Sequence, residues 1–168
     1  MNASLNELSP KLKNTSSGFT LIELMVTITV LAIIAGIAAP NISTQLADQR
    51  VKSTAATIAN ALKEAKVESI LRRQNITVLY DTSTTPSKIV LQANGTSISS
   101  YNLNRQSAVT QQISPATVTN IVFRPSKSID GGATVVYTVC DSGSTSESPK
   151  QVSLTSIANV DITNAGSC

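Results

Sequence analysis

Few side chains in this sequence are of the types that perform acid–base or metal chemistry. The 168 residues contain no histidine, which is the commonest general base and metal ligand. Ser126, Lys127 and Ser128 place hydroxyls beside an amine, but no base-orienting partner or oxyanion motif accompanies them. The sequence therefore predicts no catalytic residue. We expect a protein that is not an enzyme and that carries no cofactor.

Carboxylates are the next candidate ligands. Asp130, Asp141 and Asp161 offer the oxygen atoms that calcium prefers, but they lack the close spacing of a calcium-binding loop. Aspartate is also common in turns, because its side chain bonds to nearby backbone. This spacing favours turn and surface roles, and we predict no metal site.

Basic residues are scattered through the second half of the chain. The net charge of +3 at pH 7 is too small to indicate nucleic-acid binding by itself. A DNA-binding patch would have to draw on Arg105, Arg124, Lys127 and Lys150. Because they are separated in sequence, we interpret them as solvated surface charges.

One carboxylate is unusual in its surroundings. Glu23 is the only charged residue among the 21 residues from Phe19 to Ala39. A helix of that length spans about 30 Å, which is the thickness of a bilayer's hydrocarbon core. The apolar region of a secretory signal peptide is shorter, roughly 7–15 residues. A carboxylate inside such a segment is costly, so we expect Glu23 to have a partner or a function.

The residues around Glu23 carry a specific resemblance. The stretch Gly18-Phe19-Thr20-Leu21-Ile22-Glu23-Leu24 is similar to the N-terminal signature of type IV pilins and type II secretion pseudopilins. The resemblance implies that a prepilin peptidase cleaves between Gly18 and Phe19 and that Phe19 becomes N-methylated. It also places Pro40 where many pilins have a helix-weakening proline, and we expect a helix kink there.

Cleavage would explain Glu23. It would leave a cationic amine on Phe19, and a filament of staggered helices would bring Glu23 of one subunit to the Phe19 amine of its neighbour. Pairing offsets the desolvation of two buried charges only when both are present. We therefore expect Glu23 to be an assembly residue that couples subunit addition to helix register.

Four segments follow from this pattern. Lys11 and Lys13 precede the apolar run, and such positive charge places that end in the cytoplasm. We expect a single pass through the cell inner membrane, with the C-terminal domain in the periplasm, and a place in a pilus after assembly. The segments are a leader peptide (1–18), a transmembrane and assembly helix (19–40), an amphipathic second half of that helix (41–74) and a periplasmic β domain (75–168).

The expected elements are one long helix and a set of strands. Apolar or small residues recur every three to five positions from Ile42 to Ala65, which extends the helix from Phe19 to Arg73. After Gln74 the period changes to two, which predicts strands at 76–80, 89–93, 117–124, 133–140 and 151–157. The polar stretch 97–115 is interpreted as a weak strand plus a variable loop. The predicted fold class is α+β: a type IV pilin fold with the helix packed on antiparallel sheet.

The two cysteines have a structural interpretation. In an oxidising periplasm an isolated pair most simply forms one disulfide, here between Cys140 and Cys168. Metal ligation by two cysteines without histidine is disfavoured. Closing a loop of this size contributes about 3–4 kcal/mol in the chain-entropy account.

The rest of the chain resembles the FimT/FimU/GspH group of minor pilins and pseudopilins. The resemblance is carried by a helix rich in small residues (55–62), by Phe123-Arg124-Pro125, by the Gly131-Gly132 turn and by a strand that ends in Cys140. It implies a minor pilin that helps to initiate or cap a type IV pilus. Its expected partners are other minor pilins, the major pilin and the prepilin peptidase.

Two alternatives stay open. The first is a GspH-type pseudopilin of a type II secretion system. The second is a DNA-binding tip pilin for natural transformation. Members of the group that bind DNA have a Gly-Arg-x-Arg element near the last strand, whereas the comparable place here is Ala158-Asn159-Val160-Asp161, without arginine. Nucleic acid is therefore not an expected partner.

Overall fold

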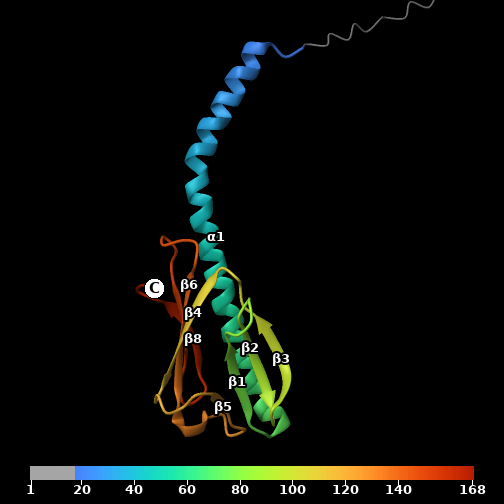
Figure 1. Ribbon diagram of the computed structural model, residues 1–168, viewed down its shortest axis with the longest axis vertical. Coiled ribbons are helices and arrows are strands. Elements are labelled where there is room, and N and C mark those ends of the chain that lie inside the picture. The colour runs from blue at the N-terminus through green and yellow to red at the C-terminus, as the bar shows by residue number, and fades with distance from the viewer. Residues whose placement is uncertain (1–17) are drawn as a thin grey trace, which may run out of the picture. The chain divides into compact units, whose positions relative to one another are not determined.

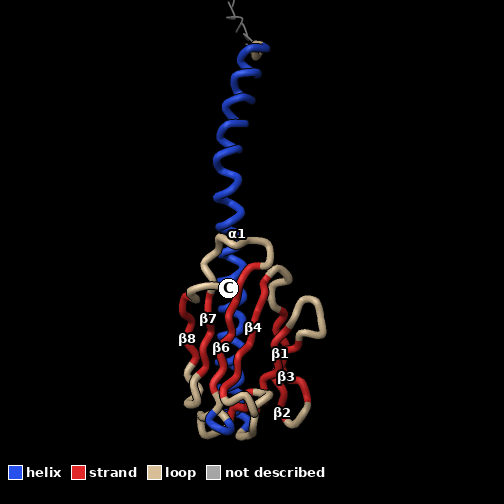
Figure 2. Tube along the Cα trace, turned by 60° about the vertical axis from the view of Figure 1, so that its left-hand side comes forward, coloured by secondary structure: helices blue, strands red, loops and turns tan. Residues whose placement is uncertain are grey.

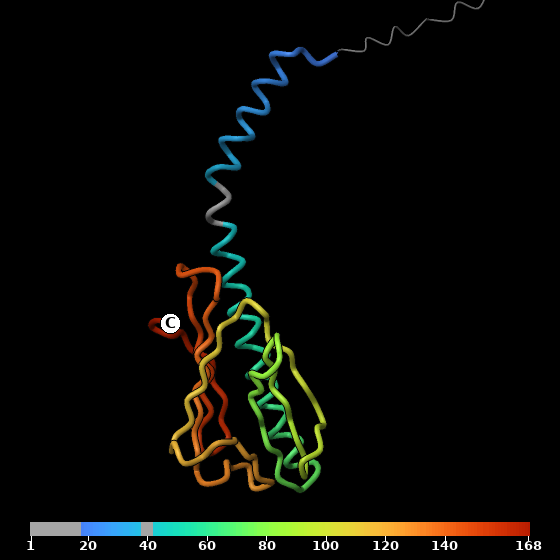
Figure 3. Tube along the Cα trace, in the orientation of Figure 1, coloured from blue at the N-terminus to red at the C-terminus, as the bar shows by residue number. Residues whose placement is uncertain are grey.

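The computed structural model describes residues 18–168, except for the side chains of residues 38–41 (Figure 3). It divides into two units, Met1–Ala38 and Ala39–Cys168, which are described separately. The leader predicted for residues 1–18 lies outside the described residues apart from Gly18. The kink predicted at Pro40 falls among the undescribed side chains, so it stays a prediction.

The helix α1 runs from Leu21 to Arg72, slightly shorter than the predicted 19–73. Every described side chain between residues 18 and 37 is exposed. Among the described residues, no single helix is both long and apolar enough to cross a membrane. The stretches 21–37 and 42–72 taken together have the length and composition to do so. Arg73 ends the helix with a φ of 53°, the left-handed conformation common at helix C-termini.

In the second unit, α1 buries one stripe of mostly small side chains. Their spacing of three or four residues keeps them on one face of the helix. Alanine at several of these positions lets strands approach the helix axis closely. The buried apolar residues of the stripe are Ala47, Val51, Ala55, Ile58, Ala59, Ala61, Leu62 and Ala65.

Two antiparallel four-stranded sheets pack against this stripe, which confirms the predicted α+β fold of a long helix packed on antiparallel sheet (Figures 1 and 2). The first sheet has the order β3-β2-β1-β5 and the second has the order β4-β6-β7-β8. The strands are β1 (Ile76–Asp81), β2 (Lys88–Ala93), β3 (Thr96–Asn102), β4 (Ser107–Ser114), β5 (Ile121–Phe123), β6 (Thr134–Asp141), β7 (Lys150–Leu154) and β8 (Val160–Asn164). The short 3-10 helix η1, Asp130–Gly132, precedes β6.

Tyr80 and Tyr137 hold the two sheets together. Tyr80 in β1 donates a hydrogen bond from its hydroxyl to the carbonyl of Val109 in β4, at 3.1 Å. Its ring meets the buried ring of Tyr137 in β6 edge-on, with centroids 6.2 Å apart. Gln111 donates to the Tyr137 hydroxyl at 2.9 Å, which satisfies that buried polar atom. Burial raises the pKa of Tyr137 above its usual value.

Three predictions about the strands were wrong. The stretch 97–115 contains two full strands, β3 and β4, because β4 has one solvated face and therefore shows only a weak apolar pattern. The strand predicted at 117–124 is shorter, Ile121–Phe123. The strand predicted at 151–157 ends at Leu154, because Thr155 and Asn159 close a turn that leads into β8, which was not predicted.

Candidate functional site

The predicted cleavage site lies just before the helix. Gly18 and Phe19 precede the first residue of α1, and both are exposed, Phe19 by 75%. A Cβ atom added to Gly18 would meet no atom within 4 Å. The fold of this chain therefore does not require glycine at position 18, and any such requirement must come from an enzyme that binds the segment.

Thr20 and Glu23 form the first turn of α1. The Thr20 hydroxyl accepts a hydrogen bond from the backbone N–H of Glu23 at 3.2 Å, so Thr20 is the N-cap. Glu23 then occupies the third helical position, which is the spacing of a capping box. A carboxylate there is stabilised by the positive end of the helix dipole. This role of Thr20 was not predicted, although the Thr-x-x-Glu spacing is a readable signal of an N-cap.

The Glu23 carboxylate is available for an external partner. Within residues 18–168 no hydrogen bond or ion pair engages its two oxygens. The side chains around it are apolar and exposed, including Leu21 and Ile22. The arrangement presents one unpaired carboxylate among apolar side chains, four residues after Phe19.

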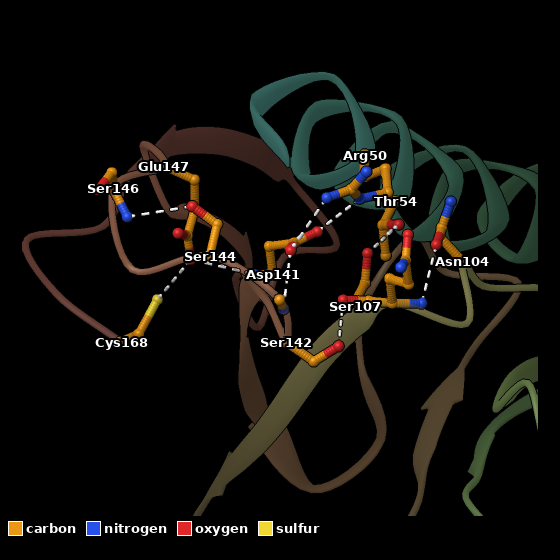
Figure 4. A network of polar contacts seen from close by, with 12 residues as sticks. Arg50, Thr54, Asn104, Ser107, Asp141, Ser142, Ser144, Ser146, Glu147 and Cys168 are labelled. Atoms are coloured by element: carbon orange, nitrogen blue, oxygen red, sulfur yellow. Dashed lines mark hydrogen bonds and ion pairs between the residues drawn. The ribbon is translucent and has the colours of Figure 1, made fainter. Parts of the chain in front are cut away.

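A second polar cluster joins α1 to the end of β6 (Figure 4). Arg50 in α1 donates from Nε and Nη2 to the two carboxylate oxygens of Asp141, at 2.6 and 3.1 Å. The Asp141 side chain is fully buried, whereas that of Arg50 is 24% exposed. The hydrogen bond from Arg50 lowers the pKa of Asp141, and a bond from the Gly143 N–H adds to this effect. Asp141 has the expected turn role, because its Oδ1 accepts the hydrogen bond from Gly143 two residues on, but the expected surface position was wrong, because the side chain is buried.

The predicted disulfide lies beside this ion pair. Cys140 and Cys168 are joined, which confirms the pairing. Glu147 lies next to both features, since its Oε1 accepts a hydrogen bond from the Asp141 N–H at 3.0 Å and is 3.7 Å from Sγ of Cys168. The cluster thus fixes the loop between β6 and β7 to the end of the chain that the disulfide holds.

The other acidic candidates do not come together. Asp130 in η1 pairs with Arg124, and Asp161 lies exposed in β8. Among residues 18–168 no group of three or more His, Cys, Asp or Glu side chains is close enough to share a metal ion. The geometry therefore offers no calcium site built from Asp130, Asp141 and Asp161.

The basic candidates are also dispersed. Arg124 is engaged by Asp130, and Lys150 donates to the side chain of Asn164. Arg105 lies in the turn between β3 and β4, whereas Lys127 lies in the turn after β5 with a positive φ of 63°. The structure does not bring these four side chains into one charged patch.

The Ser126 and Ser128 hydroxyls contact each other at 2.9 Å in the same exposed turn. No hydrogen bond in the described part of the chain links either hydroxyl to the Lys127 amine. The geometry thus does not assemble the nucleophile and base that the sequence triplet could supply.

Comparisons with known proteins match both the motif and the fold. The family model of the prokaryotic N-terminal methylation motif matches residues 13–39. Two crystal structures of the type IV minor pilin FimU from Pseudomonas aeruginosa strain PAO1 resemble this structure, with 14% sequence identity in each case. The TM-scores are 0.56 and 0.53. The aligned region covers 71% and 70% of this chain, and 96% and 98% of the respective FimU chain. A search of curated proteins gave no match.

This chain has the type IV pilin fold. The methylation motif covers Gly18 and Phe19, which precede α1, and Glu23 in its first turn. The pilin fold accounts for the domain built on the second half of that helix. The chain thus combines a prokaryotic N-terminal methylation motif with the type IV pilin fold. The roles of Gly18, Phe19 and Glu23 in processing, methylation and assembly stay predictions.

Proposed function

We propose that the chain is a minor pilin that helps to initiate or cap a type IV pilus. The observation that carries the proposal is the unpaired carboxylate of Glu23, held in the first turn of an exposed apolar helix within the matched N-terminal methylation motif. A carboxylate in that setting is stable in a membrane or a filament core only with a partner.

The partner in this proposal is the N-terminal amine of another subunit. Cleavage after Gly18 puts a cationic amine on Phe19, immediately before the Thr20 N-cap. That position is unfavourable for a cation, because the helix dipole is positive there. The Glu23 carboxylate of a neighbouring subunit would offset this repulsion between the Phe19 amine and the helix dipole. The same contact would give the neighbour's Glu23 the cationic partner that it lacks.

The role is structural in this proposal, and the protein is not an enzyme. The methylation motif indicates an N-terminal anchor and association with a pilus. We place the chain in the inner membrane before assembly, with residues after 41 in the periplasm. Prepilin peptidase, other minor pilins and the major pilin are its proposed partners.

The experiment that tests the proposal separates a pilus from a secretion system. Deleting the gene should reduce the number of surface pili per cell and leave secretion of extracellular enzymes unchanged, and the intact gene should restore piliation. The chain should be recovered with pili sheared from the cell surface. Normal piliation with a secretion defect would instead assign the chain to a type II secretion system.

A further inference from the structure

The last two turns of α1 carry exposed apolar side chains. Val67, Ile70 and Leu71 are 51%, 36% and 71% exposed, although the same turns bury Ala65 and Ser69 on the opposite face. In Figure 1 this is the green end of the helix, beside the first sheet. Side chains three and four positions apart on a helix are neighbours, so the three residues form one surface.

The turn between β7 and β8 lies against the helix beside this surface. Lys66 donates a hydrogen bond to the carbonyl of Ala158 at 2.8 Å, which fixes that turn against the helix. Lys66 is therefore occupied within the fold, whereas the three apolar side chains stay exposed. We define Val67, Ile70 and Leu71 as the Val67 patch.

Unpaired cations border the patch. Lys63 and Arg73 are exposed and lie one turn before Val67 and one turn after Ile70. No hydrogen bond or ion pair within residues 18–168 engages either side-chain cation. The nearby carboxylates are occupied, because Glu68 pairs with Arg72 and Glu64 accepts hydrogen bonds from Ser99 and Tyr101.

This charge pattern selects among possible occupants. A symmetric contact with a second copy of the chain would set Lys63 and Arg73 against like charges, which disfavours it. A nucleic acid would use the cations but would leave three aliphatic side chains without a role, since phosphate contacts are polar. The complementary surface is an apolar patch on another protein with carboxylates at its rim.

We infer that the Val67 patch docks a neighbouring pilin-type subunit through apolar side chains bordered by aspartate or glutamate. This inference rests on the proposed function, because it assumes that the chain assembles with other subunits. It adds the surface and the chemistry of the partner, and it makes the contact independent of the pairing between Glu23 and Phe19.

Site-specific crosslinking in the bacterium that encodes the chain tests the contact. The full-length chain carries the photo-reactive residue p-benzoylphenylalanine at Val67, with Arg105 as the control position in the turn between β3 and β4. We expect an adduct from Val67 but not from Arg105. Mass spectrometry should identify a different protein with an N-terminal methylation motif, and its crosslinked peptide should contain a carboxylate.

Three substitutions at exposed positions test the chemistry. Leu71→Asp places a charge in the apolar surface and Lys63→Glu reverses a bordering cation. Each should lower recovery of the chain in sheared pili by about tenfold, because a factor of ten corresponds to the loss of one good interface contact. Arg105→Glu makes the same charge change away from the patch and should leave recovery unchanged. Equal melting temperatures of the purified full-length chains exclude unfolding as the cause.

A charge-exchange experiment decides whether the contact is direct. Changing the aspartate or glutamate in the partner's crosslinked peptide to lysine should restore recovery of the Lys63→Glu chain in sheared pili. Adducts with lipid or with a second copy of this chain would overturn the inference, as would normal recovery of both patch variants. In those cases the unaltered chain would still be found in sheared pili, and the proposed function would stand. Absence of the unaltered chain from pili would overturn both.

Discussion

Arg50 holds both carboxylate oxygens of Asp141, 91 residues further along the chain, by two hydrogen bonds. The contact joins α1 to the end of β6, one residue after the disulfide cysteine Cys140. Because the Asp141 side chain is fully buried, loss of Arg50 would leave a buried carboxylate without its counter-charge.

The first prediction concerns this ion pair. In a fragment spanning residues 41–168, Arg50→Ala should lower the free energy of unfolding, because the buried Asp141 carboxylate loses its counter-charge. Lys52→Ala removes an exposed cation two residues away and should change stability by less than about 0.5 kcal/mol. Urea denaturation measures both variants, and equal stability of the two would contradict the structural role of Arg50.

The same pair predicts how stability depends on pH. The pKa of Asp141 is lowered in the folded state, so its contribution is present above the unfolded pKa of about 3.9 and is lost as pH falls through the lower folded value. The difference in unfolding free energy between wild type and Asp141→Asn should therefore be constant from neutral pH to about pH 5. It should shrink below about pH 4. A difference that persists unchanged at pH 2 would show that the charge of Asp141 is not responsible.

The second prediction concerns processing. Gly18→Val should leave the precursor uncleaved in the inner membrane, whereas the fold has room for the added side chain. Mass spectrometry of the N-terminus should show mature wild-type chain beginning at methylated Phe19. Finding chains that still begin at Met1 in assembled pili would refute cleavage at Gly18.

The third prediction concerns Glu23. Glu23→Ala should insert into the membrane normally, because removing a charge from an apolar segment favours insertion. Its recovery in sheared pili should fail, because the Phe19 amine of a neighbour would lack a partner. Glu23→Asp keeps the charge on a shorter side chain and should recover partly. Pili that contain Glu23→Ala at the wild-type level would rule out the pairing.

The fourth prediction concerns the disulfide between Cys140 and Cys168. Cys140→Ser should destabilise the 41–168 fragment by about 3 kcal/mol, through the added freedom of the unfolded chain. Thermal unfolding should show a melting temperature lower by about 10 °C. A thiol assay of the unreduced wild-type fragment should give no reactive thiol, and two reactive thiols would contradict the bridge.

The fifth prediction concerns DNA. Two of the four basic candidates, Arg124 and Lys150, already have intramolecular partners. With so few cations free to neutralise phosphates, the fragment should bind duplex DNA no better than about 10⁻⁴ to 10⁻⁶ M at physiological salt. Fluorescence anisotropy measures the affinity. Nanomolar binding that is abolished by Arg105→Ala would make DNA uptake the leading function.

The long elements were predictable from the sequence because their signals are local. The apolar run after Phe19 and the stripe that continues to Ala65 indicate the helix, and the helix begins and ends within two residues of the prediction. The dipeptide Asn94-Gly95 is typical of a tight hairpin turn, and in the structure both residues have the positive φ that the turn between β2 and β3 requires.

What was missed depends on partners that are distant in sequence. Strand β4 is half solvated, and its inner face includes the polar residue Gln111, so the sequence shows no clear alternation of apolar and polar residues there. Gln111 faces inward because Tyr137, on the neighbouring strand, lies opposite and accepts its hydrogen bond. The partner of Asp141 is Arg50, and neither residue has a neighbour in sequence that indicates the other. Edge strand β8 has only Val160 and Ile162 as apolar residues, too few for a strand pattern.

The alanine-rich stripe of α1 has a consequence for how the chain is made. Ribosomes add residues from the N-terminus, so the helix that both sheets share as a support is complete before any strand exists. Alanines such as Ala55, Ala59 and Ala61 expose little apolar surface. Before the strands are synthesised, the helix therefore presents only a weak binding surface to chaperones and other nascent chains. Cys140 emerges later and must stay a free thiol until Cys168, 28 residues on, follows it. The second sheet and the disulfide therefore cannot be completed before the last residues of the chain arrive, and because the chain has only two cysteines, a Cys140 oxidised earlier would pair with a thiol of another molecule.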